Sequence, residues 1–274
     1  MFGHKVVFLN PVFGGHGEVF KQLVEDEYEL YRIENYRDAK SVLREFKDSI
    51  CFAHAEGNLE KRKMINFILS CSKDGSLSTT IFYLIASELS SKEKKVLEGA
   101  GSCYAGMITL NPRTAFMIQD IERNLEEKNA KGRRQFVRIS CADDKQATAL
   151  AELGERIYKF KMHDISIMGS ACVVEGKFAA VFEKGTVIQN VNFALGGKTI
   201  AVSKVVVYGV FPAGADVKLV LLFSEALKGE NKDFVHKYIV TSFENDVDAI
   251  IKTHPRDQED YSKDFDKSAD ADEQ

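Results

Sequence analysis

The sequence predicts two domains: a parallel α/β domain over residues 1–130 and an all-β domain with a C-terminal helix over residues 131–254. In the first part, continuous apolar runs alternate with segments of helical periodicity, which favours a parallel sheet covered by helices on both faces. After residue 131 the apolar segments are short, β-branched and aromatic, as in an antiparallel barrel or sandwich. A length of 274 residues also favours two domains of ordinary size.

The first domain is expected to contain five strands and five helices that take turns along the chain. Apolar runs predict strands at residues 4–10, 28–35, 49–55, 79–87 and 103–111. Apolar residues at steps of three and four predict helices at 17–27, 36–46, 59–71, 90–100 and 113–129. The fourth helix has a serine at its predicted N-cap and a glycine after its end.

The second domain is expected to be rich in short antiparallel strands. The strand candidates are residues 135–143, 156–166, 169–176, 178–185, 198–211 and 216–225. Residues 231–254 predict a helix that packs along the barrel. Residues 255–274 contain three basic and eight acidic residues and few apolar ones, which predicts a disordered acidic tail.

Composition and charge limit the classes of function. The net charge is −4, so no overall positive field exists to attract nucleic acid, and a polyanion site must be local. The five cysteines are scattered and never form a CxxC pair, which indicates reduced thiols in a cytoplasmic protein rather than disulfides or a zinc site. We expect neither a secretory leader nor a membrane span.

The predicted order of five strands and five helices resembles the receiver domain of response regulators, in topology and length but not in motifs. A receiver needs an acidic pair after its first strand, where this chain has the sequence LNP at residues 9–11. It needs an aspartate at the end of its third strand, where Ala53, His54 and Ala55 lie, and a lysine after its fifth, where Asn111 lies. Since Mg²⁺ requires several carboxylate oxygens, we predict a degenerate receiver without metal or aspartyl phosphorylation.

An arginine-rich segment connects the two predicted domains. The stretch GRRQFVRIS places Arg133, Arg134 and Arg138 within six residues, between the last helix of the first domain and the first strand of the second. Arginines that cap a helix or extend along a surface explain such a pattern equally well when it is considered alone.

A second motif, DxSxxG, follows at Asp164, Ser166 and Gly169. Alone, it is also compatible with a strand that ends in an Asx turn. However, Asp164 follows Arg138 by 26 residues, about the length of one strand, a turn and a returning strand. Because an antiparallel return brings the two motifs side by side, we predict that they form one site.

Together, RRQFVR and DISIMG resemble the signature of the PilZ domain, a cyclic di-GMP receptor with RxxxR followed by [D/N]xSxxG. The resemblance covers residues from about 131 to 250 and implies a six-stranded antiparallel β-barrel closed by a C-terminal helix. It also implies a mobile RxxxR arm that folds over the ligand, and a basic residue before the motif is typical of binding an intercalated ligand dimer. Carried over by position, the implied ligand-binding residues are Arg133, Arg134, Arg138, Asp164, Ser166 and Gly169.

The chemistry of these residues suits cyclic di-GMP, which has two phosphates and two guanines. A guanidinium group forms paired hydrogen bonds with phosphate oxygens or with guanine O6 and N7, and it stacks on a purine. An ionised Asp164 can only accept hydrogen bonds, so it favours the N–H donors of guanine over adenine. Ser166 could contact phosphate or orient the aspartate, and Gly169 would permit close backbone approach or a positive φ.

These observations predict a non-catalytic cyclic di-GMP receptor, with no cofactor, that controls an unidentified protein partner. The resemblance implies partners in motility, pilus, polysaccharide or transcription machinery, and we expect neither membrane nor nucleic acid as a partner. Gly132 is the predicted hinge at which ligand binding would order the arm and rearrange the domains. The alternatives are a PilZ-like interaction module that binds no ligand and an OB-like nucleic-acid binder; an enzyme is disfavoured because no nucleophile–base pair is evident.

Overall fold

The computed structural model describes residues 3–10, 17–111 and 113–263, and the chain divides into two compact units. The first, here called the α/β unit, comprises Met1–Gln135 and Phe243–Gln274. The second, here called the barrel unit, comprises Phe136–Ser242. The α/β unit is therefore built from two separate stretches of the chain.

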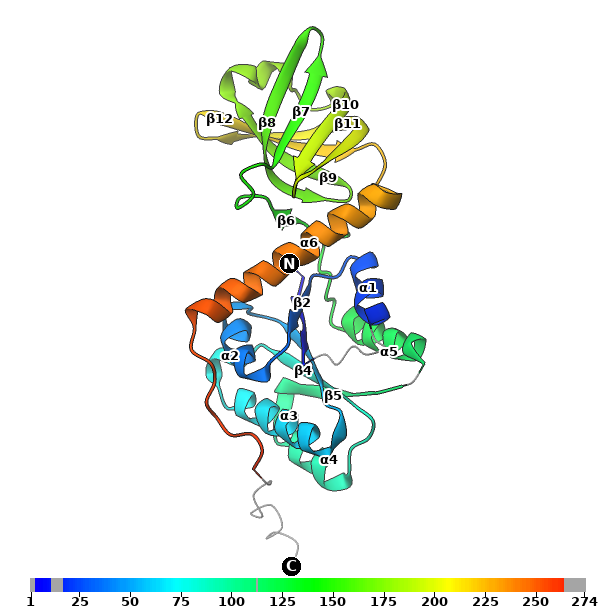
Figure 1. Cartoon of the computed structure of the whole chain (residues 1–274), viewed down its shortest axis with the longest axis vertical. Helices are drawn as coiled ribbons and strands as arrows, with labels where there is room; N and C mark the ends of the chain where they lie inside the picture. The colour runs from blue at the N-terminus through cyan, green and yellow to red at the C-terminus, as the bar shows by residue number, and fades with distance from the viewer. Residues whose placement is uncertain (1–2, 11–16, 112, 264–274) are drawn as a thin grey trace, which may run out of the picture. The chain divides into compact units, whose positions relative to one another are not determined.

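The α/β unit contains a five-stranded parallel sheet with the strand order β2-β1-β3-β4-β5 (Figure 1). This receiver-like order is one of the two common doubly wound arrangements. The strands are β1 (Val6–Leu9), β2 (Leu30–Ile33), β3 (Ile50–His54), β4 (Ile81–Ala86) and β5 (Tyr104–Thr109). Every residue of β1 and β3 is buried, as expected for central strands with helices on both sides.

Five helices cover the sheet: α1 (Gly17–Glu25), α2 (Tyr36–Glu45), α3 (Gly57–Ser72), α4 (Ser91–Glu98) and α5 (Thr114–Glu127). Leu23 of α1 and Ile121 of α5 share one apolar core with Phe52, on one face of the sheet. On the opposite face, Phe67 of α3 packs edge-on against Phe82 of β4 with ring centroids 6.0 Å apart. The predicted N-cap is confirmed at α4, where a serine and a glutamate form a capping box.

The barrel unit is an antiparallel sheet that closes on itself. Six strands form the ring β8-β7-β10-β11-β12-β9, and β9 pairs back with β8. The short strand β6 is not one of the six; it pairs with the C-terminal end of β8, at Asp164 and Ile165, where β9 also pairs with β8. The strands are β6 (Ile139–Ser140), β7 (Thr148–Leu153), β8 (Arg156–Ser166), β9 (Gly169–Glu175), β10 (Val187–Leu195), β11 (Lys198–Ala213) and β12 (Asp216–Phe223). The predicted fold class, an α/β domain followed by a six-stranded barrel and a helix, is confirmed.

The positions of three barrel segments differ from the sequence prediction. Residues 178–185 are not a strand; the chain forms a 3₁₀ helix there, η3 (Gly176–Val181), followed by a turn. Two strands, β7 and β10, were not predicted. In β7 the inward positions hold only alanines, which give a weak strand signal. In β10, Gln189 and Asn190 interrupt the alternation, and Asn190 has a φ of 52°.

The C-terminal helix α6 (Gly229–Thr253) passes from one unit to the other. Val235 and Ile239 are buried in the part that belongs to the barrel unit, which extends to Ser242. Phe243 begins the part that belongs to the α/β unit, and its ring centroid lies 4.7 Å from that of Tyr31 in β2. The predicted helix is therefore confirmed, and its last residues pack on the α/β sheet.

The acidic segment after α6 differs from the disorder that the sequence predicts from Pro255 onward. Across 255–263 the chain packs on the α/β unit, and Tyr261 is only 2% exposed. A single aromatic anchor and a set of ion pairs hold this segment, which its average composition does not reveal. The remaining residues of the predicted tail, 264–274, lie outside the described residues.

Candidate ligand-binding site

The strand ends that would form a receiver site carry no carboxylate in the part of the chain that the structure describes. Asn10 follows β1, Ala53 and His54 end β3 with Ala55 after them, and Asn111 lies two residues after β5. Pro11, the last residue of the LNP sequence that replaces the acidic pair of a receiver, lies outside the described residues. No group of three or more histidine, cysteine, aspartate or glutamate side chains among the described residues could hold a metal ion.

The arginine-rich arm leads from α5 to β6 without forming a helix or strand at residues 134–138. Gly132, with a φ of 60°, lies in the turns that follow α5, and its N–H donates to the carbonyl of Asn129. Arg133, Arg134 and Arg138 are all exposed. The first two belong to the first stretch of the α/β unit, which ends at Gln135, and only Arg138 is part of the barrel unit.

The strand register brings the end of the arm beside the DxSxxG motif. In the β6–β8 pair, Ser140 lies opposite Asp164; continued by one residue beyond β6, this register sets Arg138 opposite Ser166. In the β8–β9 pair, Ser166 lies opposite Gly169. Directly paired residues of an antiparallel sheet share a face, and neighbouring strands are about 4.8 Å apart. Arg138, Asp164, Ser166 and Gly169 therefore lie in two adjacent rows on the outer face of the barrel.

Asp164 is held in place at a β-bulge. The register of β8 and β9 shifts between Met162 and Asp164, so His163 is the extra residue. Asp164 Oδ1 accepts a hydrogen bond from the backbone N–H of Ala171 at 3.1 Å. Asp164 Oδ2 lies 3.4 Å from His163 Nδ1, and the aspartate side chain is 20% exposed. The bulge and these two contacts fix a carboxylate at the barrel surface.

Ser166 and Gly169 shape the tight turn between β8 and β9. The Ser166 hydroxyl donates to the carbonyl of Gly169 at 3.2 Å and accepts from the N–H of Met168 at 3.3 Å, and the serine is 1% exposed. A Cβ added at Gly169 would lie 2.4 Å from the carbonyl oxygen of Leu221 in β12. Close backbone approach therefore requires a glycine at this position, and the serine hydroxyl is used within the turn.

Two lysines that the sequence analysis did not single out flank the same face. Lys161 of β8 and Lys218 of β12 both lie opposite Val173 of the intervening strand β9. Lys161 is exposed, whereas the next residue, Met162, is buried inside the barrel. Alternation along β8 marks Lys161 as outward-facing, but by itself it would place Asp164 on the opposite face. The extra residue at the His163 bulge brings Asp164 to the face of Lys161, so the sequence pattern alone could not have joined the two.

No thiol near the site is available as a nucleophile. Cys141, directly after β6, and Cys172 of β9 are both buried. Burial raises the pKa of each of these thiols to about 12, so both are neutral at physiological pH. The arrangement offers guanidinium and ammonium groups with one fixed carboxylate, which suits binding of an anion that also carries N–H donors.

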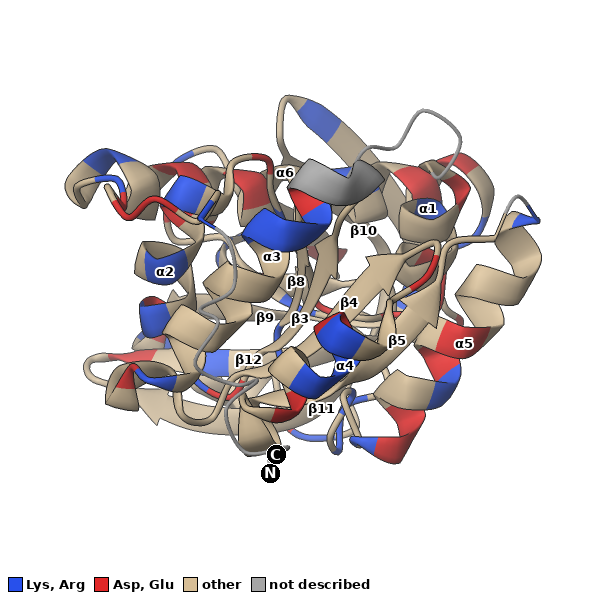
Figure 2. Cartoon of the chain, turned by 90° about the horizontal axis from the view of Figure 1, so that it is seen from below, with Lys and Arg blue, Asp and Glu red and all other residues tan. Residues whose placement is uncertain are grey.

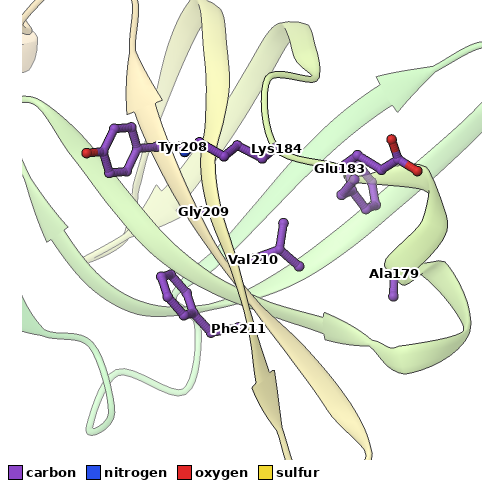
Figure 3. A pocket seen from close by; sticks show the side chains of 8 residues that line it. Ala179, Glu183, Lys184, Tyr208, Gly209, Val210 and Phe211 are labelled. Carbon is purple, nitrogen blue, oxygen red and sulfur yellow. The ribbon is translucent and has the colours of Figure 1, made fainter.

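A separate pocket of about 510 Å³ lies elsewhere on the barrel, between η3 and the far part of β11. Figure 3 shows Lys184 extending toward Tyr208, and the lysine Nζ lies 5.7 Å from the centroid of that ring. Tyr208 and Phe211 are 60% and 52% exposed. The lining includes none of the six predicted ligand-binding residues, so this pocket is not part of the candidate site.

Comparison with known proteins gives likenesses among solved structures only. No protein-family profile and no curated protein matches the chain. The chain is similar to the PilZ domain of YcgR from Escherichia coli with c-di-GMP, at 14% identity and a TM-score of 0.37, over 44% of this chain and 99% of that one. It is similar to the Bacillus subtilis inhibitor of motility (MotI/DgrA), at 20% identity and a TM-score of 0.33, over 40% of this chain but only 51% of that one.

The chain is also similar to the Vibrio cholerae chemotaxis protein CheY4, at 15% identity and a TM-score of 0.35, over 44% of this chain and 98% of that one. At these TM-scores the likenesses carry no argument about function. Among the described residues, no helix is both long and apolar enough to cross a bilayer.

Proposed function

We propose that this chain is a non-catalytic receptor for cyclic di-GMP, which binds on the outer face of the barrel unit beside Asp164. The strand register carries this proposal, because it sets the end of the arm at Arg138 next to the DxSxxG motif on one face. Arg133 and Arg134 act from the arm that precedes β6. The five scattered and buried thiols fit a cytoplasmic protein.

Each group has a distinct task in this proposal. The fixed carboxylate of Asp164 accepts hydrogen bonds from the N–H groups of a guanine and disfavours adenine. The arginine side chains contact phosphate oxygens or the guanine O6 and N7 edge. Lys161 and Lys218 add positive charge on the same face, where a doubly anionic ligand would need it. Ser166 and Gly169 support the site by shaping the hairpin under Asp164.

Ligand binding also acts on a connection between the units, because the arm is one of the two stretches that join them, and α6 is the other. An arm that closes over the ligand becomes ordered from Arg133 to Arg138, and Gly132 is the hinge from which it moves. The resulting population shift changes the surface offered to a protein partner. Small-angle scattering with and without ligand tests this step: unchanged profiles would contradict the rearrangement while leaving binding intact.

Calorimetry with cyclic di-GMP on the full chain tests the binding itself. We expect a dissociation constant in the micromolar range or below, about tenfold to a hundredfold weaker binding by Arg138→Ala, and weak binding of cyclic di-AMP. The matched control is Arg156→Ala, which removes an exposed arginine from the opposite end of β8 and leaves affinity unchanged. The absence of binding at about 100 µM cyclic di-GMP would refute the proposal. The stoichiometry measured in the same titration separates one ligand from an intercalated pair.

A second candidate is a PilZ-like interaction module without a ligand. It is favoured by the fact that Asp164, Ser166 and Gly169 all have structural contacts within the barrel. A well-folded chain that binds no cyclic di-GMP would support it. An OB-like nucleic-acid binder is less favoured, since the net charge is −4, and Figure 2 shows acidic residues beside basic ones along α5. A gel-shift assay would identify it.

A further inference from the structure

The chain's own segment after α6 is seated on α2 and α3 within the α/β unit. The ring of Tyr261 lies edge-on to Tyr36 and to Phe67, with centroid separations of 5.7 and 5.5 Å. Lys40 Nζ lies 5.4 Å from the centroid of the same ring. Tyr261 is therefore enclosed by two aromatic rings and a cation, an arrangement that suits a tyrosine or phenylalanine side chain.

Two carboxylates of the segment converge on the same lysine. Lys40 Nζ is 3.0 Å from Glu259 Oε2 and 3.3 Å from Asp257 Oδ2, and the lysine side chain is only 12% exposed. The hydroxyl of Ser70 also donates to Glu259 Oε2, at 2.7 Å. With the segment in place, the ammonium of Lys40 is largely removed from water and is neutralised by these two carboxylates, so this surface favours acidic residues.

A third set of contacts recognises the backbone of the segment. The Asn66 side-chain amide donates to the carbonyls of Tyr261 and Lys263, at 2.8 and 2.9 Å. The N–H of Asp257 donates to the carbonyl of Arg37 at 2.8 Å. These bonds hold an extended segment whatever its side chains are, and the aromatic and ionic contacts add the sequence preference.

We propose that the surface formed by Tyr36, Lys40, Asn66, Phe67 and Ser70, here called the α2–α3 face, is a docking site for an acidic, tyrosine-containing segment of a partner protein. The chain's own Asp257–Tyr261 segment, with the pattern D-x-E-x-Y, occupies this face and competes with the partner. The preferred partner segment carries two carboxylates and then an aromatic side chain at the same spacing. The inference goes beyond the proposed function, because none of these contacts involves the barrel.

The balance between the two occupants follows from effective concentration. A tethered segment acts at an effective concentration on the order of 1 mM, so it excludes weak binders and yields to tighter or clustered ones. Tyr261 is the one fully buried side chain of the segment, and the Glu259 side chain is 51% exposed. Ion pairs with exposed members weaken in salt, so the chain's own segment and an acidic partner should both hold this face less tightly as ionic strength rises.

Ionisation also controls docking. Burial of Asp257 acts to raise its pKa. Hydrogen bonds from Tyr261 and the Glu259 N–H, together with the charge of Lys40, outweigh burial and lower the pKa of Asp257. For Glu259, burial likewise acts to raise the pKa. Hydrogen bonds from Ser70 and Lys40 outweigh burial, so the pKa of Glu259 is lowered. The pKa of both carboxylates is lower in the docked segment than in a free one. Ionisation therefore stabilises docking fully when the pH is above the ordinary carboxylate pKa, and docking weakens as the pH falls through the lowered pKa values.

The test uses a fluorescent synthetic peptide with the sequence of residues 255–263 as the partner. A full-length chain with Asp257→Ala, Glu259→Ala and Tyr261→Ala leaves the face uncovered, and we expect it to bind this peptide at least about tenfold more tightly than the wild-type chain. Adding Lys40→Ala should remove most of that gain. The matched control peptide carries alanine in place of its tyrosine and should bind weakly to every chain.

A second measurement uses only the wild-type chain. Millimolar peptide should accelerate amide hydrogen exchange in residues 255–263, because it displaces the chain's own segment. If exchange is unchanged, or if the triple variant is folded and binds the peptide no better than wild type, the proposal is wrong. A concentration-dependent dimer of the wild-type chain that Tyr261→Ala abolishes would assign the face to a second copy and would also overturn it.

Discussion

The two halves of the proposed ligand site are built in opposite ways. The hairpin half, from Asp164 to Gly169, is fixed by its own contacts: a carboxylate bound to a backbone N–H, a serine inside a turn and a glycine against a neighbouring strand. In the arm half, Arg133, Arg134 and Arg138 are exposed, Phe136 and Val137 are partly buried, and residues 134–138 form neither helix nor strand.

This difference assigns two roles to two parts of the motif: the hairpin contributes to the folding of the barrel, and the arm contributes mainly to ligand binding. The hairpin presents a preformed acceptor, which provides selectivity at little entropic cost. In the proposed mode of binding, the arm provides charge and loses conformational freedom when it closes over the ligand. Substitutions in the arm should therefore change affinity alone, whereas substitutions in the hairpin should change the stability of the barrel as well.

The largest expected effect is at Gly169. Gly169→Ala places a Cβ against the backbone of β12, and the barrel should lose about 2 to 3 kcal/mol of stability and about 10 °C in Tm. Thermal unfolding followed by circular dichroism measures this loss. Gly17→Ala is the control, since an added Cβ there meets nothing within 4 Å. A variant as stable as wild type would contradict the close approach of β9 and β12.

Substitution of Asp164 should change both the stability of the barrel and the affinity for the ligand. Asp164→Ala leaves the N–H of Ala171 without its acceptor and removes the guanine-selective carboxylate, so stability should fall by about 1 kcal/mol and affinity by tenfold or more. Asp164→Asn keeps one acceptor oxygen for the N–H of Ala171, so it should restore stability, but its NH2 group replaces the second oxygen and the affinity should stay reduced. Calorimetry and thermal melts on both variants make the comparison; equal behaviour of the two would show that the acceptor is unimportant.

Ser166 should affect stability more than binding. Ser166→Ala removes both hydrogen bonds within the turn and should cost about 1 kcal/mol of stability, while cyclic di-GMP affinity changes less than about threefold. Parallel melts and titrations are again the measurement. A large affinity loss without destabilisation would instead mean that the hydroxyl turns outward and contacts the ligand.

The smallest expected effect is at the lysines of the outer face. Lys161→Ala should weaken ligand binding about threefold at low salt and less at high salt, because an exposed ammonium acts mainly through screened attraction. Titrations at two salt concentrations measure it. Lys159→Ala, on the same strand but one row farther from Asp164, is the matched control and should have less influence.

Most of the fold could be predicted from the sequence, because apolar periodicity and caps are local signals. The five alternating βα units and the capping serine of α4 follow from such signals. The missed strands β7 and β10 owe their formation to pairing partners, since inward alanines and a left-handed Asn190 carry little strand signal of their own. The docking of residues 255–263 was not predicted, because it depends on contacts between Tyr261 and Glu259 and a lysine, Lys40, that is more than 200 residues away in the sequence.

The residues of the candidate site were predicted from motif spacing, but several of their physical roles were not. The spacing between Arg138 and Asp164 correctly indicated an antiparallel return, which β6 and β8 provide. The bulge at His163 and the use of the Ser166 hydroxyl within its turn depend on three-dimensional register. The flanking position of Lys218 depends on a strand more than 40 residues away, which no local pattern reveals.

The shared helix α6 has a practical consequence for dissecting this molecule. Since Phe243 and the residues after it belong with the first 135, the barrel is an insertion within the α/β unit rather than an appendage to it. A fragment that stops before Phe243 would deprive Tyr31 of one of its two aromatic neighbours and Lys40 of the carboxylates of Asp257 and Glu259. To study the α/β unit alone, residues 136–242 should therefore be replaced by a linker, so that both stretches of the unit are kept.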